Sequence, residues 1–122
     1  TPAAAQLSPE HGLSGDDFLY VLFVSNDEGT QPTPELKVVL TLPKELQFVA
    51  GDAGEGIKIT GSGQKAESSV FVLKPPAQKV RFRFRVKVLS VPPSQLVKAV
   101  AEVQSASNGI VLASETESTT VK

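Results

Sequence analysis

Apolar and cationic residues alternate without a break between positions 80 and 89, and this alternation constrains the fold more than any other feature. The segment reads VRFRFRVKVL. Successive side chains of a β-strand point to opposite faces, so the apolar residues all face one way: Phe82, Phe84, Val86 and Val88. The cations then face the other way: Arg81, Arg83, Arg85 and Lys87. Burial of one large apolar side chain contributes about 1.5–3 kcal/mol, so four of them fix the register of a half-buried strand.

Five further segments have the length and the β-branched or aromatic content of strands. They are residues 18–24 (FLYVLFV), 36–42 (LKVVLTL), 46–50 (LQFVA), 57–60 (IKIT) and 69–73 (SVFVL). Prolines and glycines separate these segments and mark turns between them. Several short strands at this spacing predict a β-sandwich or a β-barrel.

The segment that follows the two prolines at 92–93 permits two interpretations. A helix over 94–103 would use Ser94 as its N-cap. A strand over the same residues would turn every second residue from Val97 onward toward the core. We favour the strand, because Asn108-Gly109 then closes a two-residue hairpin onto the Ser/Thr-rich C-terminal segment. Asn-Gly supplies the positive φ angles that a type I′ turn requires.

The composition is that of one soluble domain. The chain has 122 residues, of which 40% are hydrophobic and 20% charged, far from the profile of a disordered protein. The longest apolar run, 18–24, is too short for the ~20 residues that cross a bilayer, so we expect no membrane insertion. Cysteine is absent, which excludes disulfides and thiolate metal sites. The polar start lacks a signal-peptide pattern, so we expect a piece of a longer protein or a processed form.

Charge is distributed unevenly along the chain, although the net charge is only -1. Residues 1–36 contain six acids and no lysine or arginine, whereas residues 74–98 contain seven cations and no acid. A net charge near zero argues against general nucleic-acid binding. The two segments should attract each other if they lie side by side, or steer charged partners if they do not.

The sequence predicts no catalytic residue, no cofactor site and no metal site. His11 is the single histidine and lies in a polar leader. It is therefore the only imidazole that could act as the base for a serine nucleophile. The carboxylates at 16–17, at 27–28 and at Asp52 and Glu55 lack the spacing of a calcium loop, and we interpret them as solvated turn residues. The glycine-rich stretch 51–63 lacks a P-loop lysine and is interpreted as a hairpin or sheet-edge loop.

The segment LKVVLTLPKELQFVAGDAG (36–54) resembles part of a bacterial family, the conserved repeat domain known as domain of unknown function eleven. YVLFVSNDEGT (20–30) is similar to the strand that precedes this part in the family, with Tyr20, Leu22, Val24 and Asn26 in matching positions. LKPPAQKVRFRFRVKV (73–88) and KAVAEV (98–103) resemble its later strands. A fainter likeness to cohesin and other carbohydrate-system modules lies in the same strand pattern.

The resemblance implies an all-β, immunoglobulin-like antiparallel sandwich of about seven or eight strands over residues 15–122. Residues 1–14 would be a leader, a linker or a first edge strand. It further implies a non-catalytic spacer, adhesion or assembly domain of a bacterial cell-surface or secreted protein. Its partners would be neighbouring domains of the parent chain or another protein. Two alternatives are a ligand-binding module of cohesin or carbohydrate-system type and an accessory domain of a secreted enzyme.

One surface stands out as a candidate for interaction. If Tyr20, Leu22 and Val24 face inward as the family pattern implies, an apolar strip of Leu19, Val21 and Phe23 faces outward. In an immunoglobulin-like topology this strip would lie beside the row Arg81, Arg83, Arg85 and Lys87, with arginine side chains over Phe23. Either the N-terminal stretch AAAQL covers the strip or a partner does. The interpretations left open for the cation row are a solvated strand with local ion pairs, contact with another domain or copy, and binding of an anionic polymer.

Overall fold

Nine strands make up the part of the chain that the computed structural model describes. The described residues are 3–10, 17–26, 32–74, 78–90, 93–94 and 96–120, with the backbone alone at 3–10, 17–18 and 119–120. The strands are β1 (Ala3–Glu10), β2 (Asp17–Asn26), β3 (Leu36–Thr41), β4 (Leu46–Ala53), β5 (Ile59–Ser62), β6 (Lys65–Ser68), β7 (Lys79–Val88), β8 (Leu96–Ser105) and β9 (Val111–Thr120). No helix long and apolar enough to cross a membrane occurs in these residues.

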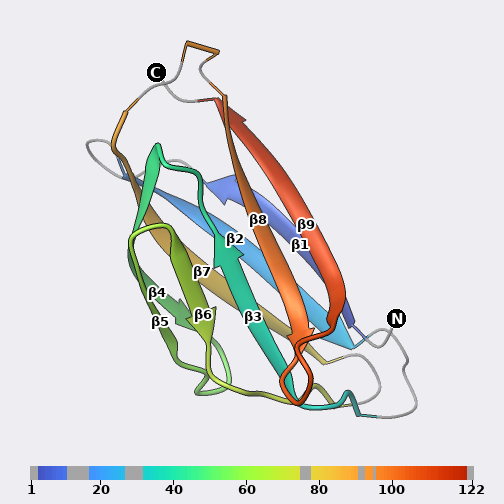
Figure 1. The fold of residues 1–122 in the computed structure, drawn as a ribbon. Coiled ribbons are helices and arrows are strands. Elements are labelled where there is room, and N and C mark those ends of the chain that lie inside the picture. Colours follow the sequence, from blue (N-terminus) through green and yellow to red (C-terminus); the bar gives the residue numbers. More distant parts are fainter. Residues whose placement is uncertain are drawn as a thin grey trace.

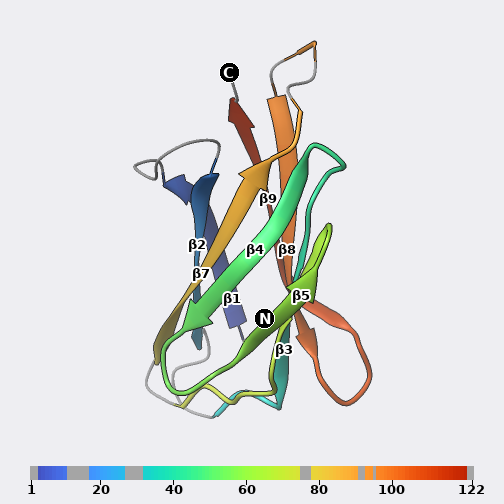
Figure 2. The same cartoon turned by 90° about the vertical axis from the view of Figure 1, so that its left-hand side faces the viewer.

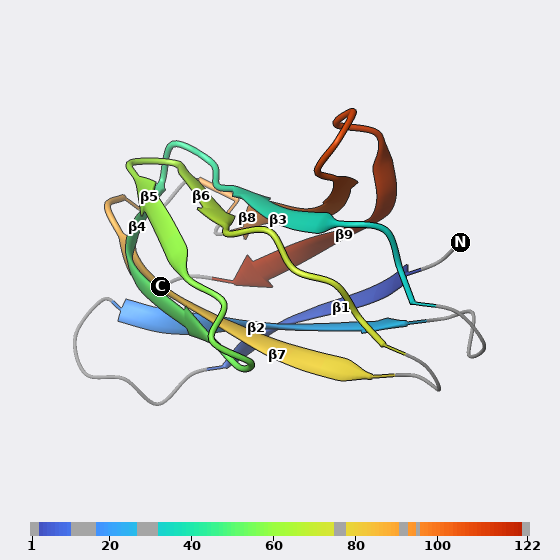
Figure 3. The same ribbon diagram turned by 90° about the horizontal axis from the view of Figure 1, so that it is seen from below.

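The strands form two stacked antiparallel sheets, which confirms the predicted all-β sandwich. One sheet has the order β1-β2-β7-β4 and the other the order β5-β6-β3-β8-β9. Figure 3 shows the two layers edge-on, with the core between them. At the sides of the sandwich the sheets approach each other, since β1 lies beside β9 and β4 lies beside β5 (Figure 1).

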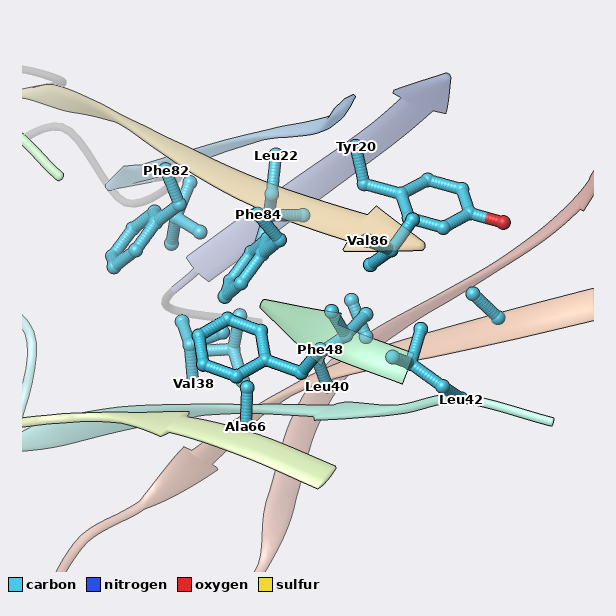
Figure 4. Close-up of a cluster of buried hydrophobic side chains, with 14 of the residues drawn as sticks. Tyr20, Leu22, Val38, Leu40, Leu42, Phe48, Ala66, Phe82, Phe84 and Val86 are labelled. Carbon is cyan, nitrogen blue, oxygen red and sulfur yellow. The ribbon is translucent and has the colours of Figure 1, made fainter. Parts of the chain in front are cut away.

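Alternation in β7 and β2 builds one half of the core, as the sequence predicts. Phe82, Phe84 and Val86 are fully buried, while Val88 is half-buried against them. The rings of Phe82 and Phe84 stack with centroids 6.4 Å apart. On β2 the residues Tyr20, Leu22 and Val24 are each 0% exposed. Figure 4 shows Leu22, Phe82 and Phe84 pointing toward the opposite sheet, where Val38 and Leu40 of β3 lie.

The C-terminal third is a β-hairpin, which confirms the strand interpretation of 94–103. The type I′ turn predicted at Asn108-Gly109 is wrong, however. Four residues, 106–109, separate Ser105 from Ile110, whose carbonyl accepts a hydrogen bond from the Ser105 amide at 2.8 Å. Only Gly109 has a positive φ, 74°. Asn108 instead accepts a hydrogen bond from the Ile110 amide through its side chain at 3.0 Å, so this longer loop needs one left-handed residue where a type I′ turn needs two.

The predicted strand at 69–73 is also wrong, because this segment makes one isolated bridge, between Phe71 and Leu36. The strand between β3 and β5 is β6, whose sequence KAES carries no β-branched residue and was not predicted as a strand. Its partner β5 begins two residues later than the predicted 57–60 strand. Gly63, with a φ of 61°, occupies the first position of the two-residue loop between β5 and β6, as in a type II′ turn.

Hydrogen bonds from buried polar groups hold the irregular segment 69–74 in place. Asn26 is 2% exposed and Thr33 5% exposed. The Leu73 carbonyl accepts bonds from Asn26 Nδ2 at 3.2 Å and from the Thr33 amide at 2.9 Å. The Leu73 amide donates to Thr33 Oγ1 at 2.9 Å. Asn26, one of the residues that carries the family resemblance, is therefore a structural residue, because an unpaired polar group in this position would be costly.

The N-terminal stretch AAAQL does not lie across the outer face of β2. It belongs to β1, whose residues pair along the edge of β2 in the register Gln6 with Phe23 and Glu10 with Leu19. Of the two coverings left open for the apolar strip, this stretch is therefore excluded, because its pairing with β2 places its backbone in the plane of the sheet.

A close contact between β4 and β5 closes the side of the sandwich that faces the viewer in Figure 2. A Cβ atom on Gly51 would lie 2.8 Å from Ile59 Cγ2 and 3.0 Å from the Arg83 carbonyl oxygen. Real Cβ atoms essentially never come this close to another carbon. Glycine at this position is therefore required by packing, since its backbone carries no positive φ.

Gly51→Ala should lower the free energy of unfolding by about 1–3 kcal/mol, because the added methyl group overpacks the contact with Ile59. Gly54→Ala is the matched control, since a Cβ there would meet only Val80 Cγ1 at 3.9 Å, and it should change stability by less than about 0.5 kcal/mol. Urea denaturation of both variants provides the measurement. Equal stability of the two variants would show that the β4–β5 contact is loose.

Candidate interaction face

The structure brings together all seven residues that the sequence singles out. They lie on the outer surface of the four-stranded sheet, where β2 pairs with β7 in the register Leu19 with Arg85, Val21 with Arg83 and Phe23 with Arg81. Lys87 follows one step beyond Arg85 on the same side of β7. We call these seven residues the arginine face. Their outward placement follows from alternation, because the residues between them fill the core.

The apolar strip is less exposed than expected. Val21 is only 8% exposed although it lies outside the core cluster, and Leu19 and Phe23 are half-buried. Lys79, which lies outside the predicted cation row, is placed above the Phe23 ring, with its Nζ 5.0 Å from the ring centroid. The apolar residues thus form a floor for the cationic side chains, as long amphipathic stems commonly do.

An ion pair occupies the centre of the face. Arg83 Nε donates to Asp52 Oδ1 at 2.7 Å, and Arg83 Nη2 donates to Asp52 Oδ2 at 2.5 Å. This two-point arrangement matches the fork of the guanidinium to the carboxylate. Asp52 is solvated, as predicted, but its predicted place in a turn is wrong, because it stands in β4 opposite Arg83.

A β-bulge in β4 brings Asp52 to this face. Before the bulge, Phe48 faces the core opposite Val86; beyond it, Ala50 pairs with Arg85 and Asp52 with Arg83. The extra residue, Val49, shifts the alternation by one position, so that the following even-numbered residues point outward. Without the bulge, the carboxylate of Asp52 would point into the core.

The pKa of Asp52 is lowered from its ordinary value of 3.8, chiefly by the hydrogen bond from Arg83. The positive charges of Arg83 and Arg81 act in the same direction, and partial burial opposes them. The pair is well exposed, with 44% of the Arg83 side chain and 59% of the Asp52 side chain accessible, so solvent screens it. The pair therefore stays charged at neutral pH and contributes little to stability.

Two hollows flank the central ion pair. The first has a volume of about 260 Å³ and is lined by Leu19, Ala50, Gly51, Asp52, Arg83 and Arg85. The second has a volume of about 420 Å³ and is lined by Asp52, Ala53, Gly54, Arg81 and Arg83. Each hollow therefore contains one arginine beyond the central pair, and both are shallow and open to solvent.

The described side chains of this face are groups suited to binding. Within the described ranges, no three histidine, cysteine or acidic side chains gather as metal ligands would. His11 and the carboxylates of residues 16–17 and 27–28 lie outside the residues whose side chains the structure describes. The cationic face of β7 lies beside β2, so the acidic and basic halves of the chain are neighbours, with Asp17 in register with Lys87.

Sequence reasoning missed Asp52, the small residues Ala50 and Gly54 beside the arginines, and Lys79. Alternation counted from Phe48 puts Asp52 on the inner side, and only knowledge of the bulge corrects the count. A signal was available in the GDAGEG sequence after Phe48, because glycine inside a strand pattern indicates a bulge or a close approach of backbones.

No protein-family model and no curated protein sequence matches the chain, so membership of the conserved repeat family stays a prediction. Solved structures do share the fold. The sixth cohesin from Acetivibrio cellulolyticus scaffoldin B, solved in complex with a Cel5 dockerin mutant, has a TM-score of 0.67 at 12% identity over the whole of both chains.

Two bacterial surface proteins are also similar. The collagen-binding domain of a Staphylococcus aureus adhesin has a TM-score of 0.57 at 6% identity, covering 99% of this chain and 98% of its own. The major pilin SpaD from Corynebacterium diphtheriae has a TM-score of 0.62 at 13% identity and is matched over 34% of its length. At these identities the likeness defines the fold class, an immunoglobulin-like sandwich shared by cohesin, adhesin and pilin domains.

Replacing both Arg83 and Arg85 with serine should lower the free energy of unfolding by no more than about 1 kcal/mol, because exposed ion pairs contribute about 0–1 kcal/mol. Phe84→Ala in the same strand is the control and should cost about 3–5 kcal/mol. Chemical denaturation followed by circular dichroism measures both. Unfolding of the double variant would show that the arginine face is buried in a larger contact.

The stability difference between the native protein and Asp52→Asn should depend on pH. The folded pKa of Asp52 is lower than the unfolded value of 3.8, so the carboxylate stabilises the fold above that pH. This contribution is lost as the pH falls through the folded pKa. The difference should be constant above about pH 5 and shrink below about pH 4, measured by urea denaturation at each pH. A difference that grows in acid would contradict the assignment.

Proposed function

We propose that this domain is a non-catalytic interaction module of a bacterial cell-surface or secreted protein, and that it contacts its partner through the arginine face. The observation that carries the proposal is the composition of that face: half-buried Leu19 and Phe23 lie beside a row of cations on a hollowed outer surface. Arginine and aromatic residues are enriched at the centres of protein interfaces, whereas the solvent-exposed face of an ordinary strand carries small polar groups.

The path of the chain suits a spacer or an assembly unit. The start of β1 and the end of β9 lie at opposite ends of the sandwich (Figure 1). A chain that enters at one end and leaves at the other extends a row of domains lengthwise. Strands of ten residues, such as β7 and β9, give each unit a length of about 33 Å. Such a unit holds its outer faces clear of its neighbours in the row.

The structural neighbours support the same class of function. They are domains of a surface adhesin, a pilin and a cohesin, and the cohesin is solved bound to a dockerin. We propose a location outside the cell or in the cell envelope on this ground and on the sequence resemblance. An accessory domain of a secreted enzyme would use the same face for contact with its catalytic domain.

Site-specific photo-cross-linking in the parent protein tests this proposal. A benzoylphenylalanine in place of Lys87 should yield a discrete adduct in the producing cells, because exposed Lys87 borders the proposed contact. The same label in place of Lys98 is the control, since this exposed residue lies on the other sheet. The Lys87 adduct should disappear when Arg81 and Arg85 are also replaced with serine. Equal adducts at both positions, or none at Lys87, would overturn the proposal.

A further inference from the structure

We propose that the arginine face binds an extended acidic segment of a partner protein, with two carboxylates four residues apart seated in the two hollows beside the Arg83–Asp52 pair. This inference rests on the proposed function and specifies the chemistry of the partner. It follows from three features of the face: the small residues in the hollows, the spacing of the arginines, and the neutralised centre.

Small residues on β4 leave room beside the two outer arginines. Ala50 stands opposite Arg85, and the Gly54 amide donates to the Arg81 carbonyl at 3.2 Å, so Gly54 stands beside Arg81. Between them Asp52 stands opposite Arg83 and fills the corresponding space. The row therefore offers room for an incoming carboxylate at its two ends and a built-in carboxylate at its middle.

The spacing selects an extended segment. Arg81 and Arg85 are four residues apart in one strand, which corresponds to about 13 Å at ~3.3 Å per residue. Carboxylates at positions i and i+4 of an extended chain have this separation. In a helix the same two positions lie only about 6 Å apart. For two acids four residues apart, a segment in strand conformation running along β7 therefore fits and a helix does not, since a helix would need its acids about nine residues apart to span the same distance.

The centre of the face selects against a third acid. A carboxylate at position i+2 of the bound segment would approach Asp52, whose negative charge already satisfies Arg83 through two hydrogen bonds. The carboxylate of the segment and the carboxylate of Asp52 would then be close to each other and would repel. The segment should therefore carry a neutral or basic residue between its two acids. A uniformly charged polyanion, with a charge every few ångströms, meets the same repulsion.

Each outer arginine has the donors that this role requires. A guanidinium carries five N–H groups and can bind an incoming carboxylate while keeping another contact. Leu19 lines the hollow that contains Arg85, so the methylene groups of a glutamate would have an apolar surface there. Charge-assisted bonds of this kind fix the position of a segment as well as holding it.

Fluorescence anisotropy with labelled synthetic peptides tests the inference on the intact domain. The probe is an alternating Thr/Val peptide with two glutamates four residues apart. Arg81→Ser and Arg85→Ser should each weaken its binding about tenfold or more, whereas Lys98→Ser on the other sheet should leave it unchanged. Moving the glutamates to two residues apart should weaken binding to the native domain to a similar degree.

A third glutamate at the central position gives the decisive comparison. The third glutamate should weaken binding to the native domain and strengthen binding to Asp52→Asn. In that variant the repelling charge is gone, and Arg83 can donate hydrogen bonds to the new carboxylate. Equal binding of all three peptides, tighter binding of polyphosphate than of the spaced peptide, or no binding at about 1 mM peptide would overturn the inference. A cross-link at Lys87 in the parent protein would in that case still support the arginine face as the contact with the partner.

Discussion

The two-residue period of β7 is the constraint on which the rest of the structure depends. One strand supplies Phe82 and Phe84 to the core and, between them, the arginines of the outer surface. A shift of one residue would bury guanidinium groups and expose phenyl rings, at a cost of several kcal/mol for each buried charge. The position of each arginine is therefore as firmly determined as the core, although the arginines themselves contribute little to stability.

The bulge in β4 connects this register to the chemistry of the surface. β4 enters the sheet with Phe48 in the core and leaves it with Asp52 beside Arg83, and the extra residue Val49 accounts for the change. Beyond the bulge the inward position opposite Phe84 belongs to Gly51, which has room for no side chain against Ile59. The same irregularity thus joins β4 to β5 on the inside and places a carboxylate among cations on the outside.

Hydrophobic periodicity predicted the strands whose alternate side chains fill the core. It did not predict the strand whose position depends mainly on backbone hydrogen bonds. The segments around β2, β3, β4 and β7 were recognised because alternate residues are large and apolar. β6 was missed, since Ala66 is its one buried hydrophobic residue and its pairing with β3 and β5 comes from the backbone. The arginine row was predicted directly, but Asp52 was not, because its orientation depends on a bulge that the sequence marks only by nearby glycines.

The outer faces of the sandwich carry side chains through which such a domain can make contacts. β1 lies beside β9 and β4 beside β5, so the two sheets approach each other along both sides, although each of these four strands is an edge of its own sheet. On the five-stranded sheet the outer charges are of both signs and pair locally, as Lys37 does with Glu67 at 2.9 Å. On the four-stranded sheet Asp52 pairs with Arg83, and Asp17 stands in register with Lys87. Among the side chains that the structure describes, cations outnumber acids on the arginine face, and this composition favours an acidic partner.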